Sequence, residues 1–285
     1  MPTPNGSKGR WGPRIERAEK LSADHPFAAE ILQFYIRILN FQKDQYARIE
    51  SACGTTRMAR LGASLRNELD LILLLPTFPS FLNLLNRYAP SPLAAAACEL
   101  STQGTQAYAE LLTAWWSNPV GSAKTAGETT AGILQTDGPR FCARAFLEPY
   151  AAYLAEHTDP PVIEVTPSVC PLCESRPQFG ILRPQGEGAS RSLVCSLCAT
   201  EWRFGRILCP ACGESSEIHL AVYIAEEWPH MRVEACETCH SYIKTVDLSK
   251  CGHAVPVVDE ITAIPLDLWA REKGYTKLQA NLLGI

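Results

Sequence analysis

Eight of the twelve cysteines in this 285-residue chain occur as four Cys-x-x-Cys pairs. Two residues between the cysteines allow a tight turn to direct both sulfurs at one ion, so each pair supplies half of a tetrahedral metal site. One pair alone is weak evidence for metal binding, whereas four pairs in succession predict two sites with four cysteine ligands each. The candidate ligands are Cys170, Cys173, Cys195, Cys198, Cys209, Cys212, Cys236 and Cys239.

The order of the pairs predicts how they combine. Residues 170–202 resemble residues 209–242, with an offset of 39 residues at the first pair of each segment and 41 at the second. We therefore predict a sequential arrangement, in which the first two pairs form cluster one and the last two form cluster two. The gaps of 21 and 23 residues within these clusters each fit a β-hairpin that returns the chain to the same ion. An interleaved cross-brace is the alternative.

Four thiolates suit either zinc or a single iron ion, because both accept tetrahedral sulfur ligation. Zinc would be structural, whereas iron would be redox-active as in rubredoxin. Three residues that follow the second pair of each segment are candidates for contact with the sulfurs or with a partner: Trp202, His240 and Tyr242. The two aromatic rings could shield iron from water, but the favoured interpretation is that they fill a thin ribbon core.

The elements that must position these pairs change in character near residue 160. In the first half, apolar residues recur every three or four positions, which predicts helices. These helices are expected over 24–41, 58–72, 91–115 and 139–156, with a short one after Pro79. We also expect a loop or weak helix over 118–136 and a break or kink at Pro149. The second half has short β-like runs at 179–182, 192–194 and 218–223 and a helical tail at 265–273.

The expected fold class is α+β: an N-terminal all-α helical bundle, then tandem rubredoxin-like or zinc-ribbon modules, then a short C-terminal helix. Prolines concentrated between residues 158 and 167 mark the boundary. The expected domains are residues 1–160, residues 161–250 with modules at about 168–206 and 207–248, and a tail at 251–285. The first twenty residues resemble a variable arm.

Composition narrows the possible functions. The net charge of −4 disfavours a strongly basic nucleic-acid-binding surface. No apolar run reaches the length of a membrane span and the N-terminus lacks the apolar core of a secretory leader, so we expect a cytoplasmic protein. We find no phosphate-binding loop, nucleophile elbow or metalloprotease motif, and therefore predict that the chain is not an enzyme. The acidic residues Asp247, Asp259, Glu260 and Asp267 are assigned to a solvated face.

Two strings around the cysteines resemble a known protein family. We call the tight turn around each Cys-x-x-Cys pair a knuckle. Residues 195–202 (CSLCATEW) and 234–244 (EACETCHSYIK) are similar to the second and fourth knuckles of the formate dehydrogenase accessory proteins of the FdhE type. The four pairs follow the order of that family, and the helical first half and the tail at 266–275 are also similar. Glu174 is a departure, because a glycine often occurs at this position of a knuckle.

The resemblance implies a cytoplasmic maturation factor that binds the catalytic subunit of formate dehydrogenase before export. It also implies rubredoxin-like iron held by the eight cysteines. Two other hypotheses are kept. One is a zinc-ribbon nucleic-acid binder that would use Arg183, Arg191, Arg203 and Arg206. The other is a rubredoxin-like redox protein, in which iron passes electrons or a free thiol such as Cys251 reacts.

Overall fold

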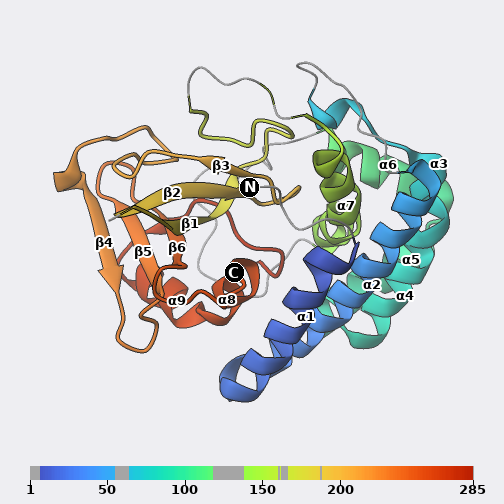
Figure 1. Cartoon of the computed structure of the whole chain (residues 1–285). Helices are drawn as coiled ribbons and strands as arrows, with labels where there is room; N and C mark the ends of the chain where they lie inside the picture. Colours follow the sequence, from blue (N-terminus) through green and yellow to red (C-terminus); the bar gives the residue numbers. More distant parts are fainter. Residues whose placement is uncertain are drawn as a thin grey trace.

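The structure is a computed structural model that describes residues 7–54, 64–117, 138–159, 161, 166–186 and 188–284. Figure 1 shows two halves side by side, with the helices of the first half in blue to green and the sheet with its two covering helices in yellow to red. The predicted α+β fold class is confirmed. No helix in these ranges combines the length and apolar character needed to cross a bilayer.

The described part of the first half contains seven α-helices, packed around an apolar core that contains several phenylalanine rings. The rings of Phe78 and Phe146 lie 4.8 Å apart between centroids, and those of Phe41 and Phe81 lie 4.9 Å apart. The apolar repeat of the sequence thus places these side chains on the inner faces of the helices. The helices are α1 Ser7–Asp24, α2 Ala29–Cys53, α3 Leu71–Leu74, α4 Phe78–Tyr88, α5 Ser91–Ser101, α6 Thr105–Trp116 and α7 Gly138–Glu156.

Several helix boundaries differ from the predictions. Most of the expected variable arm is helical, because α1 begins at Ser7. Pro26 opens a short 3₁₀ turn, so α2 begins only at Ala29. The helix expected over 58–72 lies partly outside the described residues, and its described part is a 3₁₀ turn at Leu65–Asn67 followed by the start of α3. The helix expected over 91–115 is two helices, because Gly104 adopts a positive φ of 82° between them.

The last helix of this half, α7, continues through Pro149, so the predicted break is absent. The loop or weak helix expected over 118–136 lies outside the described residues.

The second half contains one mixed sheet with the strand order β3-β2-β1-β6-β5-β4, and β7 pairs with β6. Each cysteine segment contributes an antiparallel hairpin, β1–β2 and β4–β5, as the gap lengths predict. The strands are β1 Pro177–Gln185, β2 Gly188–Cys195, β3 Glu201–Arg203, β4 Leu220–Ile224, β5 Met231–Cys236, β6 Ser241–Asp247 and β7 Thr276–Lys277.

A parallel pairing between β1 and β6 joins the two segments into this single sheet. Gly180 of β1 lies against Thr245 of β6, and a Cβ atom at Gly180 would approach Thr245 Oγ1 to 2.4 Å. The missing side chain is therefore required for the close approach of the two strands. Because strands from both segments and from the tail share one sheet, the three-part domain division stays a prediction.

Two short helices, α8 Pro256–Thr262 and α9 Ile264–Glu272, cover one face of the second hairpin. The helical tail expected over 265–273 is thus confirmed as α9. The assignment of the acidic residues to a solvated face is wrong for Asp259, Glu260 and Asp267, whose exposed fractions are 1%, 0% and 2%. They are buried because basic side chains from distant segments lie opposite them.

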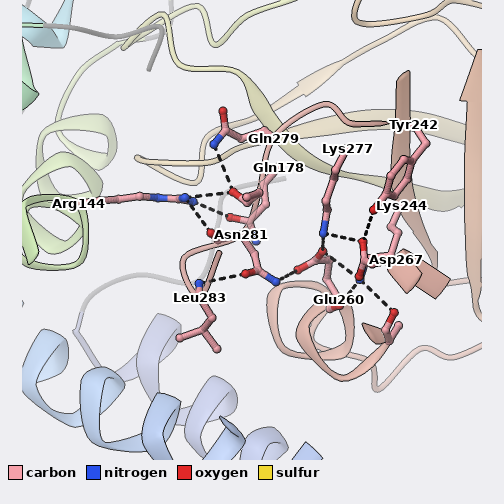
Figure 2. Close-up of polar contacts among 12 residues, drawn as sticks. Arg144, Gln178, Tyr242, Lys244, Glu260, Asp267, Lys277, Gln279, Asn281 and Leu283 are labelled. Carbon is pink, nitrogen blue, oxygen red and sulfur yellow. Dashed lines mark hydrogen bonds and ion pairs between the residues drawn. The ribbon is translucent and has the colours of Figure 1, made fainter. Parts of the chain in front are cut away.

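Figure 2 shows the buried charge cluster around Glu260 and Asp267. In it, Lys244 of β6 and Lys277 of β7 face the carboxylates of α8 and α9. Lys244 Nζ lies 3.1 Å from Glu260 Oε1 and 2.5 Å from Asp267 Oδ2. Lys277 lies between the same two carboxylates. Burial alone would raise the pKa of both acids, but the two lysines outweigh it and hold the pKa of each below its ordinary value.

Candidate metal centres

The structure brings the eight cysteines together in two groups of four. Cluster one contains Cys170, Cys173, Cys195 and Cys198, and cluster two contains Cys209, Cys212, Cys236 and Cys239. Within each group all four Sγ atoms lie within 4.8 Å of one another. The grouping is therefore sequential, as the internal repeat predicts, and the interleaved cross-brace is not formed. No third group of this kind occurs among the residues that the structure describes.

The sulfur distances fit tetrahedral metal ligation. Four sulfurs at the zinc–sulfur distance of about 2.3 Å would lie about 3.8 Å from one another. In cluster two, the Sγ atoms of Cys212 and Cys236 lie 3.7 Å apart and those of Cys209 and Cys239 lie 3.8 Å apart. Cluster one is tighter, with separations of 3.3 and 3.5 Å from Cys173 Sγ to its neighbours. All eight cysteines are free thiols rather than disulfides, so each cluster could hold one metal ion.

A common backbone turn directs the sulfurs in all four pairs. The residue directly after the second cysteine has a left-handed conformation in every pair: Glu174, Ala199, Gly213 and His240 have φ values of 62°, 56°, 80° and 54°. This conformation is unfavourable for a residue with a Cβ atom, and only one of the four is glycine. The departure noted at Glu174 therefore leaves the turn unchanged. In each cluster a backbone N–H also lies 3.4 Å from a sulfur, from Leu197 to Cys195 and from Ala211 to Cys209.

The electrostatics of the clusters favour a bound cation. Burial raises the pKa of Cys195 and Cys198 well above the usual value for a thiol, and it raises the pKa of Cys209 to about 12. The pKa of Cys173 is shifted in the opposite direction. Hydrogen bonds to this thiol lower its pKa, and the hydrogen bond with Cys170 has the largest effect. Four buried thiols cannot all ionise beside one another without positive charge at the centre. A metal ion would supply that charge, so metal binding would release thiol protons.

Cluster one is buried beneath the helical half. Its four cysteines are at most 3% exposed. Three arginines from the first half donate hydrogen bonds to backbone carbonyls of its knuckles: Arg10 to Cys198, Arg66 to Cys173 and Arg144 to Ser196. Arg66 also donates to Trp116 O and Ser175 Oγ, at 2.8 and 2.7 Å. Burial lowers the pKa of Arg66, and the nearby cysteines of cluster one act against that shift.

Cluster two is open by comparison. Cys212 is exposed and Cys239 is partly exposed. Cys209 and Cys236 line a groove of about 550 Å³ between the segment 206–211 and the face of the second hairpin. The two clusters thus share a knuckle geometry but differ in access to solvent.

The three candidate contact residues have different surroundings. Trp202 is buried beside cluster one and donates from Nε1 to Pro167 O at 3.0 Å. Tyr242 is buried against α9, where its hydroxyl donates to Asp267 Oδ1 at 2.8 Å. His240 is exposed, with its ring 6.4 Å from that of Tyr275 between centroids. Packing accounts for the burial of Trp202 and Tyr242. A direct contact of Trp202, Tyr242 or His240 with a sulfur or with a partner stays a prediction.

The sequence did not indicate the arginines that cover cluster one. Arg10, Arg66 and Arg144 lie at least 52 residues from the carbonyls that they contact. A lone arginine in a helical region has no spacing signal that could connect it to a knuckle so far along the chain. Only the placement of α1, α7 and the 3₁₀ turn at Leu65–Asn67 over cluster one identifies them.

Comparison with known proteins points to one family. Residues 169–206 match the FdhE central domain and residues 207–283 match the FdhE C-terminal domain. The chain is 39% identical to "Protein FdhE homolog" from Aquifex aeolicus over 117 residues, which is 40% of this chain and 41% of that protein. It is 38% identical to the homolog from Pseudomonas aeruginosa over 123 residues, which is 41% of this chain and 39% of that protein. These alignments thus span about two fifths of each relative.

The fold matches over a longer range than the sequence does. The crystal structure of the FdhE protein from Pseudomonas aeruginosa superposes with a TM-score of 0.64, covering 98% of this chain and 96% of that one at 22% identity. The arrangement of the helical first half is therefore similar to that seen in the Pseudomonas aeruginosa protein. Both cysteine segments lie inside the two matched FdhE domains, so residues 169–283 are similar in sequence to FdhE proteins.

Proposed function

We propose that this protein is a cytoplasmic accessory factor for formate dehydrogenase, which binds the catalytic subunit of that enzyme during assembly and catalyses no reaction itself. The two four-cysteine clusters inside the FdhE domains are the observation that carries the proposal. The name of the matched domains and the resemblance of the knuckle strings to formate dehydrogenase accessory proteins suggest formate dehydrogenase as the client. The described residues hold no other group of metal-ligating side chains that would suggest a separate chemistry.

The eight cysteines would hold two ions, iron or zinc. A bound ion would supply positive charge that stabilises the thiolates, and iron would in addition exchange one electron. The chain itself fixes the sulfurs with left-handed knuckle residues, excludes water from cluster one and leaves cluster two facing a groove. Cluster one thus suits a structural role, and cluster two lies where a client could reach it.

The nucleic-acid alternative loses two of its four candidate arginines. Arg183 lies 2.8 Å from Glu201, and Arg191 is buried and paired with Glu234. Two of the four arginines that would contact phosphates are therefore already neutralised by carboxylates. The proposal accordingly names a protein client rather than nucleic acid.

Anaerobic affinity capture tests the proposal. The tagged protein is isolated from cells that express formate dehydrogenase, beside a variant with Cys209→Ser and Cys212→Ser and a control with the exposed Cys53→Ser. We expect the catalytic subunit with the parent protein and with the control, and a clear loss with the cluster variant. Absence of the catalytic subunit from the parent sample would refute the proposed client.

A further inference from the structure

Exposed apolar side chains gather around one strand of the sheet. Nine large apolar residues are exposed among those described, and five of them lie between residues 207 and 224. They are Ile207, Ile218, Val222, Tyr223 and Ile224, with Val222 half exposed. Single exposed apolar residues are ordinary on a protein surface, whereas a concentration of them marks an interaction site.

The strand at the centre of this group, β4, is the outer strand of the sheet. Its pairing partner is β5, and no other strand of the described residues pairs with its second edge. In Figure 1 this edge lies on the side of the molecule away from the helical half. An edge strand presents unpaired backbone N–H and C=O groups, which can accept an additional strand from another chain.

Alternate side chains of β4 face the groove beside cluster two. Val222 is the register partner of Glu234 on β5, and both line the groove together with Leu220. Tyr223 points to the other face, where its ring lies 4.6 Å from that of Trp269 between centroids. A strand added along β4 would therefore direct every second side chain toward the groove and cluster two.

Charged residues at the two ends of β4 indicate what kind of segment would pair with this strand. Glu217 precedes the strand, Glu226 and Glu227 follow it, and all three are exposed. A partner strand with lysine or arginine at both ends would meet carboxylates at each. A second copy of this chain paired antiparallel along β4 would instead place Glu217 beside Glu226 and Glu227 of that copy, and opposed like charges are destabilising. The charge pattern thus favours a different protein over self-association.

We propose that β4 binds an extended apolar segment with basic residues at both ends, donated by a partner protein and added as a further strand. The segment places alternate side chains in the groove next to Cys209 and Cys236. This inference deepens the proposed function, and rests on it to the extent that the partner is the catalytic subunit of formate dehydrogenase.

Binding of a synthetic strand tests the surface directly. The probe is a fluorescein-labelled peptide of alternating valine and threonine between paired lysines, titrated with the full chain and followed by anisotropy. We expect binding that Val222→Lys weakens by about tenfold or more, because the charge replaces apolar contact at the edge. Ile72→Lys, at an exposed apolar residue of the helical half, is the matched control and should bind like the parent protein.

Two altered probes separate strand addition from general apolar contact. Methylation of alternate backbone nitrogens removes donors from one edge of the peptide and should abolish binding when that edge faces β4. Replacement of the lysines by glutamates should weaken it, because Glu217, Glu226 and Glu227 would then face like charge. Equal binding by the parent protein and Val222→Lys would overturn the proposal, as would self-association of the parent protein that Val222→Lys abolishes.

Client capture distinguishes this inference from the proposed function. If the catalytic subunit copurifies equally with the parent protein and Val222→Lys, the docking surface is wrong while the client is retained. If the parent protein binds the peptide at β4 but never the catalytic subunit, the docking surface is retained and the proposed client is wrong.

Discussion

At the scale of single residues, the left-handed position after each cysteine pair is the most informative feature. Three of the four positions carry a side chain, at Glu174, Ala199 and His240. Holding such a residue in this conformation costs about 1–2 kcal/mol relative to the ordinary helical conformation. The chain tolerates this cost because the turn brings two sulfurs to one centre.

Replacing Ala199 by glycine should stabilise the metal-loaded protein. Glycine relieves the backbone strain but loses more entropy on folding, so we expect the free energy of unfolding to rise by roughly 0.5–1 kcal/mol. Gly213→Ala is the matched reverse change, and no atom lies within 4 Å of the added Cβ, so it tests the backbone alone. It should lower the free energy of unfolding by about 1 kcal/mol. Guanidinium titration followed by circular dichroism measures both, and a loss of stability in Ala199→Gly would contradict this explanation.

Spacing alone predicts the sulfur groups but not what surrounds them. Cys-x-x-Cys is local in sequence, and the internal repeat indicates which pairs combine, so the two clusters follow from the sequence. The contrast between buried Cys173 and exposed Cys212 depends instead on how the helical half packs on the first segment. No periodicity in either half carries that information.

At the scale of elements, the buried charge cluster connects β6 and β7 to the helices α8 and α9. Lys244 is fully buried, and its ammonium group donates to the backbone of Glu260 and Ala263 as well as to Asp267. Sequence reasoning misassigned Glu260 and Asp267 because helical spacing cannot reveal a lysine that arrives from another strand. Removing one partner from such a cluster leaves a buried charge uncompensated, which is far more costly than losing a surface ion pair.

Lys244→Met should destabilise the protein and increase its sensitivity to acid. We expect a loss of about 3 kcal/mol at neutral pH, because Glu260 and Asp267 then share only Lys277. In the parent protein the lysines lower the pKa of both carboxylates, so their stabilising effect is present above the unfolded-state pKa of about 4 and is lost as pH falls below it. The variant raises both folded-state pKa values, so acid unfolding should begin at a higher pH.

Circular dichroism during acid titration checks this shift, with the exposed Lys250→Met as control. An unchanged acid midpoint in Lys244→Met would show that the cluster does not couple stability to pH.

At the scale of the whole molecule, the first half contacts the second at cluster one and also at α8, where Arg17 pairs with Asp259, whereas cluster two is more open to solvent. Arg10, Arg66 and Arg144 bind the knuckles of cluster one from three separate elements of the first half. We therefore expect loss of metal from cluster one to need separation of the halves, and loss from cluster two to need only local opening. The repeat in the sequence gives two similar sites, and the packing makes them unequal.

Metal release to a chromogenic chelator should consequently occur in two phases of similar amplitude. We expect the slow phase to be at least about tenfold slower than the fast phase, since it needs the larger opening. Cys209→Ser with Cys212→Ser should remove the fast phase, and Cys170→Ser with Cys173→Ser should remove the slow one. A single phase in the parent protein would contradict the inequality of the two sites.

The three arginines also impose an order on synthesis. The helical half leaves the ribosome first, but three of its arginines bond to the carbonyls of Cys173, Ser196 and Cys198, whose positions the closed knuckles of cluster one would fix. We therefore expect metal binding at cluster one to favour docking of the helical half onto the sheet half. In a metal-starved cell the newly made chain would keep its two halves apart and present apolar surface to proteases. The abundance of the protein would then follow the supply of its metal without any dedicated sensor.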